Sequence, residues 1–77
     1  MTTNSNPLTK EIVLEKCKKQ NFNDIKNINL WGSDLDDVSL IRQLSNLEVV
    51  SLSVNRIHTL EDFSFCPRIQ ELYLRKN

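Results

Sequence analysis

The sequence predicts a small α/β domain in which short strands from successive segments stack into one parallel sheet. Three observations in this 77-residue chain support the prediction. Apolar residues return every 22 positions, each repeat holds two apolar residues two positions apart, and a short polar residue follows that pair. Residues two apart point to the same side of an extended segment, so each pair marks a strand with one buried side. We therefore expect stacked coils that share one apolar core.

The period becomes visible when positions 22 apart are compared. Each of the following columns keeps one chemical character: Ile25, Leu47 and Ile69; Ile28, Val50 and Leu72; Leu30, Leu52 and Leu74; Leu35 and Ile57; Val38 and Leu60; Ile41 and Phe63; and Phe22, Leu44 and Cys66. Agreement over so many columns indicates an internal repeat.

The middle repeat shows the pattern in full: Leu47-x-x-Val50-x-Leu52-x-x-Asn55-x-Ile57-x-x-Leu60-x-x-Phe63. This spacing is typical of a short leucine-rich repeat. The strand is followed by apolar residues at every third position, which predicts a tight 3₁₀-like or helical return. One coil cannot bury its own apolar edge. The predicted fold class is therefore an α/β leucine-rich-repeat solenoid with a parallel sheet on its concave face and a capping helix at its amino-terminal end.

A polar column stands where the chain leaves each strand. A buried amide at this point can satisfy backbone groups that the bend leaves unpaired. The column holds Ser33, Asn55 and Asn77. We expect Asn55 and Asn77 to be structural residues, and we expect Ser33 to act in the same way more weakly because its side chain is shorter.

The repeat pattern divides the chain into three segments. We predict a flexible amino terminus over residues 1–7, a capping helix over 8–21, and repeats over 22–77, of which two are full and the third stops at its strand. The predicted helix has Thr9 as its N-cap and Leu8 and Val13 placed for a hydrophobic staple. A basic partner-binding helix is the alternative interpretation. The incomplete third repeat leads us to expect part of a longer repeat protein or an abbreviated gene model.

Composition points away from several classes of function. Ten Lys and Arg balance ten Asp and Glu, whereas proteins that bind duplex nucleic acid usually carry a basic excess. No apolar run approaches the roughly 20 residues that span a bilayer. No secretory signal is recognised either, so we expect an intracellular protein without membrane insertion. Nucleic acid and membrane are therefore not expected as partners.

The chain shows no residue set for catalysis, cofactor binding or metal binding, so we predict a protein that is not an enzyme and has no cofactor. Its one histidine, His58, has no recognisable catalytic partner, and with only Gly32 the chain has no Gly-rich phosphate loop. Asp34, Asp36 and Asp37 supply too few oxygen ligands for calcium, so we expect a solvated acidic corner.

The candidate binding residues are those that the predicted strands point away from the core. Stacking would place them in cross-strand rows, with small side chains in the middle coil and therefore a shallow groove. Trp, Tyr and Arg are enriched at binding hot spots. An alternative is that the aromatic side chains only shield the coils beneath them. The candidate partner-binding residues are Asn29, Trp31, Val49, Ser51, Ser53, Glu71, Tyr73 and Arg75.

Four stretches carry a more specific resemblance. They are Leu8-Thr9-Lys10-x-x-Val13-Leu14; Leu30-Trp31-Gly32-Ser33-x-Leu35-x-Asp37-Val38-Ser39; Leu47-Glu48-Val49-Val50-Ser51-Leu52-Ser53-Val54-Asn55-x-Ile57-x-Thr59-Leu60-Glu61; and Cys66-x-Arg68-Ile69-x-Glu71-Leu72-Tyr73-Leu74-Arg75-Lys76-Asn77. In this order they resemble the amino-terminal repeat domain of the cilia- and flagella-associated protein 410 family, over about residues 8–77.

The resemblance implies a non-catalytic scaffold of the basal body or ciliary base, in the cytoplasm and cytoskeleton, that contributes to cilium or flagellum assembly. It also implies protein partners, among them a NIMA-related kinase. Family members continue into a helical segment that oligomerises, so oligomerisation is not expected of this chain. The alternative function is a general cytosolic or nuclear repeat adaptor of the phosphatase-regulatory, splicing-factor or dynein-light-chain type, because generic repeats of this class resemble those proteins as well.

Overall fold

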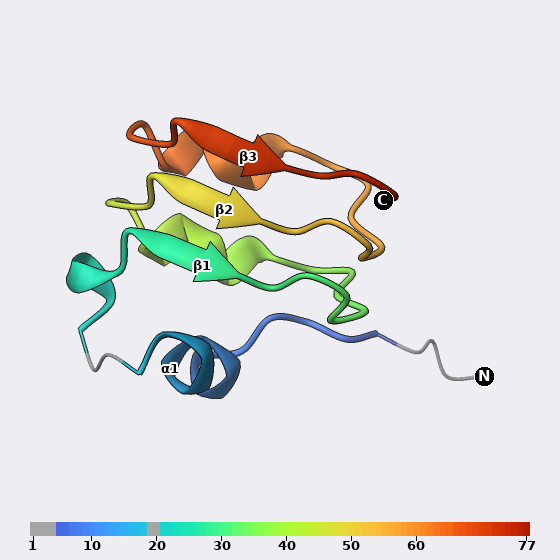
Figure 1. Cartoon of the computed structure of the whole chain (residues 1–77), viewed down its shortest axis with the longest axis horizontal. Coiled ribbons are helices and arrows are strands. Elements are labelled where there is room, and N and C mark those ends of the chain that lie inside the picture. Colours follow the sequence, from blue (N-terminus) through green and yellow to red (C-terminus); the bar gives the residue numbers. More distant parts are fainter. Residues whose placement is uncertain (1–4, 19–20) are drawn as a thin grey trace.

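Three short parallel strands and one α-helix organise the described part of the chain. The computed structural model describes residues 5–18 and 21–77. The helix α1 (Lys10–Cys17) comes first, and the strands pair in the order β1 (Asn27–Asn29), β2 (Val49–Ser51) and β3 (Glu71–Tyr73) (Figure 1). The predicted α/β class and parallel sheet are confirmed. No described helix is long and apolar enough to cross a membrane.

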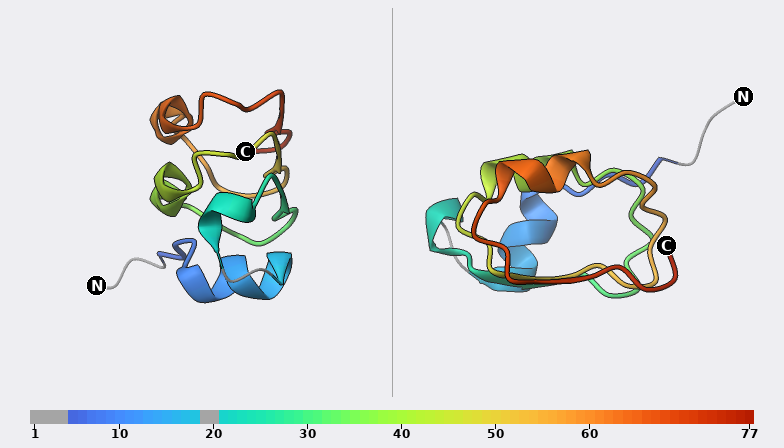
Figure 2. Two further views of the ribbon diagram at one scale, coloured as in Figure 1. Left: turned by 90° about the vertical axis from the view of Figure 1, so that its left-hand side faces the viewer. Right: turned by 90° about the horizontal axis from the view of Figure 1, so that it is seen from above.

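Strands β1 and β2 are each followed by a return on the opposite side of the stack. Short 3₁₀ helices form this second side, and Figure 2 shows two of them superposed when the stack is seen from above. We use the word coil for one strand together with its return. The 3₁₀ helices of the described residues are η1 (Phe22–Asp24), η2 (Ser39–Gln43) and η3 (Glu61–Phe65).

The strand register reproduces the 22-residue period of the sequence. Ile28 pairs with Val50, and Val50 pairs with Leu72. These three side chains face the interior, where they meet the apolar residues of the 3₁₀ returns. Register is strongly specified when one side of a strand is buried, because a slip of one residue would expose every apolar side chain.

The core is densest in the first two coils. Residues of both sides of the stack are fully buried there, among them Leu30, Ile41, Leu44, Leu47 and Leu52. Burial of one such side chain contributes about 1.5–3 kcal/mol. In the third coil the equivalent apolar side chains, Ile69, Leu72 and Leu74, are only half-buried.

The sequence wrongly placed Leu60 in the core. Val38, one period earlier, is 2% exposed, whereas Leu60 is 59% exposed. Asp37, next to Val38, pairs with Pro7 of the amino-terminal segment. Val38 therefore lies beneath a further layer of chain. Among the described residues no corresponding layer covers Leu60.

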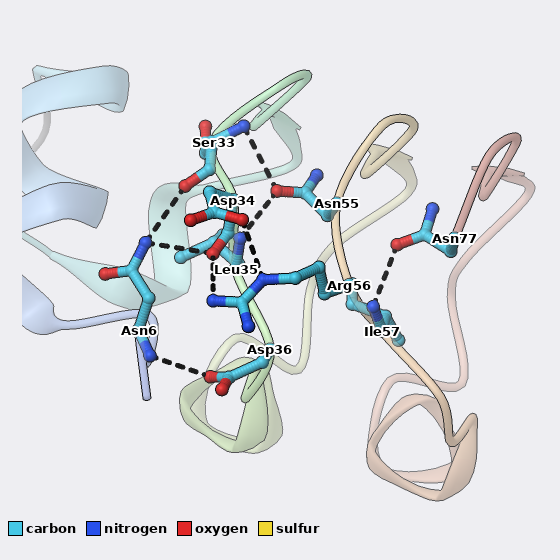
Figure 3. A network of polar contacts seen from close by, with 9 residues as sticks. All are labelled: Asn6, Ser33, Asp34, Leu35, Asp36, Asn55, Arg56, Ile57 and Asn77. Atoms are coloured by element: carbon cyan, nitrogen blue, oxygen red, sulfur yellow. Dashed lines mark hydrogen bonds and ion pairs between the residues drawn. The ribbon is translucent and has the colours of Figure 1, made fainter. Parts of the chain in front are cut away.

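Asparagine side chains connect neighbouring coils where the strands end (Figure 3). The Asn55 amide nitrogen donates to the carbonyls of Leu52 and Leu30, both at 2.9 Å. Asn77 donates in the same way to Leu74 at 2.9 Å and to Leu52 at 2.8 Å. Each asparagine therefore bonds to its own coil and to the coil before it.

Ser33, in the same column, does not act in this way. Its hydroxyl makes no hydrogen bond to a described residue. A residue outside the repeat serves the first coil instead: the Asn6 side chain donates to the carbonyls of Ser33 at 3.1 Å and Asp34 at 3.0 Å. The hydroxyl of serine is too short to span between coils, and the longer amide of Asn6 reaches the same bend from the amino-terminal side.

Asn6 and Pro7, at the end of the segment expected to be flexible, contact the first coil. The Asn6 backbone N–H donates to the Asp36 carboxylate at 2.9 Å, and Leu8 N–H donates to the Asp37 carbonyl at 2.8 Å. Residues 6–8 thus run beside the first coil as an additional short edge. Residues 1–4 lie outside the described part of the chain.

The helix α1 packs below the first coil and is shorter than the segment 8–21 assigned to it (Figures 1 and 2). Thr9 is its N-cap, as expected, and accepts from Ile12 N–H at 3.2 Å. Val13 is fully buried. The helix ends because Lys18 adopts a left-handed conformation, with φ of 54°, and its N–H bonds to the Leu14 carbonyl at 2.8 Å.

Candidate protein-binding face

The outward side chains of the sheet form the rows expected from the sequence. The strand register aligns Asn27, Val49 and Glu71 in one row and Asn29, Ser51 and Tyr73 in the next. The third row lies beyond the strand ends and contains Trp31, Ser53 and Arg75. We call this surface the sheet face.

The side chains of the sheet face differ greatly in exposure. Trp31 is 63% exposed and Tyr73 is 49% exposed, whereas Ser53 between them is 9% exposed. The Ser53 hydroxyl accepts a hydrogen bond from Arg75 N–H at 3.2 Å. Ser53 therefore forms the floor of the surface, and the aromatic side chains rise beside it.

A local turn positions Trp31. The Asn29 side-chain oxygen accepts from Trp31 N–H at 3.1 Å. The next residue, Gly32, has φ of 64° and donates its N–H to the Ser53 carbonyl at 3.0 Å. The bend thus holds the Trp31 backbone while its indole ring stays in solvent.

Glu71 positions the Tyr73 ring. The Tyr73 hydroxyl donates to the Glu71 carboxylate, two residues earlier on the same strand. This hydrogen bond, together with the negative charge of Glu71, raises the pKa of Tyr73 above its ordinary value. The hydrogen bond joins the two side chains, and Glu71 keeps its negative charge.

A hollow of about 790 Å³ opens on the sheet face between the aromatic side chains. The serines of the middle coil leave it shallow and open to solvent. Positively charged Arg75 and Lys76 stand at its rim. The residues that line it are Trp31, Ser51, Ser53, Val54, Leu72, Tyr73, Leu74, Arg75 and Lys76. Asn29, Val49 and Glu71 of the predicted set lie on the same face outside the hollow.

Sequence reasoning missed Val54 and Lys76 as part of this surface. Both residues have positive φ, 60° and 59°, and they lie in one column with Gly32. The chain makes the same left-handed bend in every coil just before the Ser33, Asn55 and Asn77 column. The sequence did not reveal it because only the first coil has a glycine there.

A second polar group, on the 3₁₀ side, was also missed. Arg42 forms an ion pair with Asp62 at 2.7 Å and lies over the Phe65 ring, 4.7 Å from its centroid. Asp62 is only 5% exposed. At the bend beside Asn55, Arg56 pairs with Asp34 at 2.7 Å (Figure 3). Arg56 and Asp34 are 22 positions apart, so the repeat could have identified that pair. Both groups join neighbouring coils.

The described residues contain no group of three or more metal-ligating side chains. Cys66 is buried beside the carbonyls of Ile41 and Leu44, at 3.3 and 3.5 Å from its sulfur. Burial raises the pKa of the Cys66 thiol, so the reactive thiolate is disfavoured.

Fold and surface together define a small α/β protein of stacked 22-residue coils with an aromatic sheet face. No family model matches the chain. It is similar to proteins named cilia- and flagella-associated protein 410: 44% identical to the one from Mus musculus and 46% identical to the one from Homo sapiens, each over 70 residues. The match covers 91% of this chain but only 28% and 27% of those relatives. An uncharacterized protein of Caenorhabditis elegans is 44% identical over 62 residues, which are 80% of this chain and 13% of that protein.

Proposed function

We propose that this chain is a leucine-rich-repeat domain that acts as a non-catalytic protein-interaction scaffold at the basal body or ciliary base. In this role it contributes to cilium or flagellum assembly. The observation that carries the proposal is the 44–46% identity over 91% of the chain to cilia- and flagella-associated proteins. Identity at this level, over nearly the whole chain, supports a related role in the same structure of the cell.

The coil geometry supports the repeat assignment. Asn55 and Asn77 make matching hydrogen bonds to the carbonyls three residues earlier and in the preceding coil. Neighbouring strands keep the 22-residue register. Each repeat contacts its neighbours, as in a solenoid.

The sheet face supports the scaffold assignment. Trp31 and Tyr73 are exposed aromatic residues. The Tyr73 side chain is held by its hydrogen bond to Glu71, so less conformational freedom is lost when a partner covers it, and the Trp31 backbone is fixed by Asn29. We expect a protein partner on this face, and the NIMA-related kinase implied by the resemblance is one candidate. The protein acts in the cytoplasm, at the cytoskeleton of the cilium base.

The experiment replaces Trp31 by alanine at the endogenous locus in ciliated or flagellated cells and scores the fraction of cells with a cilium. Arg68→Ala is the matched control, because Arg68 is exposed and lies away from the hollow. We expect Trp31→Ala to lower the ciliated fraction and Arg68→Ala to leave it unchanged. Equal ciliation in both variants, with purified Trp31→Ala protein folded by circular dichroism, would overturn the proposed role of the face.

A further inference from the structure

We propose that the hollow of the sheet face binds an extended acidic peptide with one bulky apolar side chain close to an Asp or Glu. This inference rests on the proposed function, because it names the chemistry of the partner that the face receives. Its basis is the combination of a small-residue floor, two aromatic walls and unpaired positive charge.

The shape of the hollow suits one large side chain. Ser51 and Ser53 form a low floor in the middle coil, and Trp31 and Tyr73 rise from the neighbouring coils. Its volume of about 790 Å³ lies within the usual range for binding sites of roughly 300–1,000 Å³. Because it is open rather than enclosed, it can hold a Phe or Leu side chain together with the peptide backbone on each side.

The charges around the hollow favour a carboxylate. The side chains of Arg75 and Lys76 form no ion pair or hydrogen bond with any described residue. Asp34 pairs with Arg56, whereas Glu71 accepts from the neutral Tyr73 phenol and keeps its negative charge. Arg75 and Lys76 both line the hollow and outnumber the one carboxylate of Glu71, so the local charge is positive. The guanidinium of Arg75 can bind a carboxylate with two parallel hydrogen bonds.

Aromatic and basic residues also occur in sites for single-stranded nucleic acid. Such sites need a continuous basic track for successive phosphates. Here the positive charge is confined to Arg75 and Lys76, and Glu71 carries negative charge on the same face. A peptide with one anchor side chain and a neighbouring carboxylate fits this arrangement better than a nucleic-acid strand.

The test selects peptides from a phage-displayed random library on the immobilised 77-residue chain. Affinities of selected peptides are then measured by fluorescence anisotropy. We expect peptides that place Asp or Glu within a few residues of Phe, Leu or Trp. Arg75→Glu and Trp31→Ala should each weaken binding by about tenfold or more, as expected for hot-spot residues. Arg68→Glu, which makes the same charge change away from the hollow, should bind as the wild-type chain does.

Several results would overturn the inference. The inference is wrong if the selected peptides are basic or show no charge preference, or if folded protein selects no peptide at all. It is also wrong if the Arg75→Glu variant binds the acidic peptides as tightly as the wild-type chain does. Binding of polyuridine in preference to peptide would likewise overturn it. The proposed function can be contradicted separately from this inference. If no peptide is selected but Trp31→Ala still lowers ciliation, the scaffold role stands and the acidic-peptide inference is wrong. If acidic peptides bind but Trp31→Ala leaves ciliation unchanged, the acidic-peptide inference stands and the scaffold role is wrong.

Discussion

The backbone N–H of Leu35 donates a hydrogen bond of 2.9 Å to the side-chain oxygen of Asn55 in the following coil. The same oxygen accepts from Ser33 N–H at 3.1 Å. The amide nitrogen of Asn55 serves carbonyls of both coils, including that of Leu30. One buried amide thus satisfies the backbone of two successive bends and joins two coils beyond the end of the sheet.

Asn55→Ala is therefore expected to destabilise the fold by about 2–4 kcal/mol, because buried N–H and carbonyl groups lose their partner together. Urea unfolding followed by Trp31 fluorescence measures the change. Asn46→Ala is the control, since it removes one exposed hydrogen bond, from the Asn46 side chain to the Asn23 carbonyl. A loss below about 0.5 kcal/mol for Asn55→Ala would contradict the structural role given to this residue.

Val54 occupies a left-handed conformation that a β-branched residue rarely adopts. Val54→Asn is expected to stabilise the fold by about 0.5–1 kcal/mol, because asparagine tolerates positive φ with less strain. Thermal unfolding of the two proteins measures the difference. Val49→Asn, in β2, should bring no such gain. Equal effects of the two substitutions would show that backbone strain at Val54 is not the cause.

Asn6→Ala is expected to release the amino-terminal edge from the first coil. The substitution removes two hydrogen bonds to carbonyls of that coil and should lower stability by about 1–2 kcal/mol. The local measurement is amide hydrogen exchange at Leu8, whose N–H bonds to the Asp37 carbonyl. We expect faster exchange at the Leu8 amide. Protection of the Leu52 amide should fall only as much as the global stability falls. Unchanged exchange at Leu8 would show that Asn6 does not hold this segment.

The phenol of Tyr73 should titrate above its ordinary pKa because Glu71 stabilises its neutral form. A raised folded-state pKa means that the interaction supports the fold below the unfolded-state pKa and is lost as pH rises through the folded-state value. Tyr73 is the only tyrosine, so ultraviolet absorbance of the phenolate follows it alone. Glu71→Gln should lower the titration midpoint, and Glu48→Gln should leave it in place. An unchanged titration midpoint in Glu71→Gln would show that Glu71 does not cause the raised pKa of Tyr73.

Much of the sheet could be predicted because its register depends on residues that the sequence displays. Ile28, Val50 and Leu72 must all face the core, and this requirement alone aligns the outward rows that contain Trp31 and Tyr73. The position of the aromatic side chains on one face followed from the same alternation.

Other features were hidden because they depend on contacts outside the repeat or on backbone conformation. Asn6 lies before the first repeat, so no column reveals that it bonds to the bend of the first coil. The left-handed bends at Val54 and Lys76 carry no glycine. Leu60 has the residue type of a core position, but its burial depends on a covering layer that Val38 has and Leu60 lacks.

The most direct test of the proposed scaffold role is imaging of the endogenous protein, tagged at its own locus, in ciliated or flagellated cells. The proposal predicts signal at the basal body or ciliary base. Diffuse or nuclear signal would contradict it and would favour a general cytosolic or nuclear adaptor.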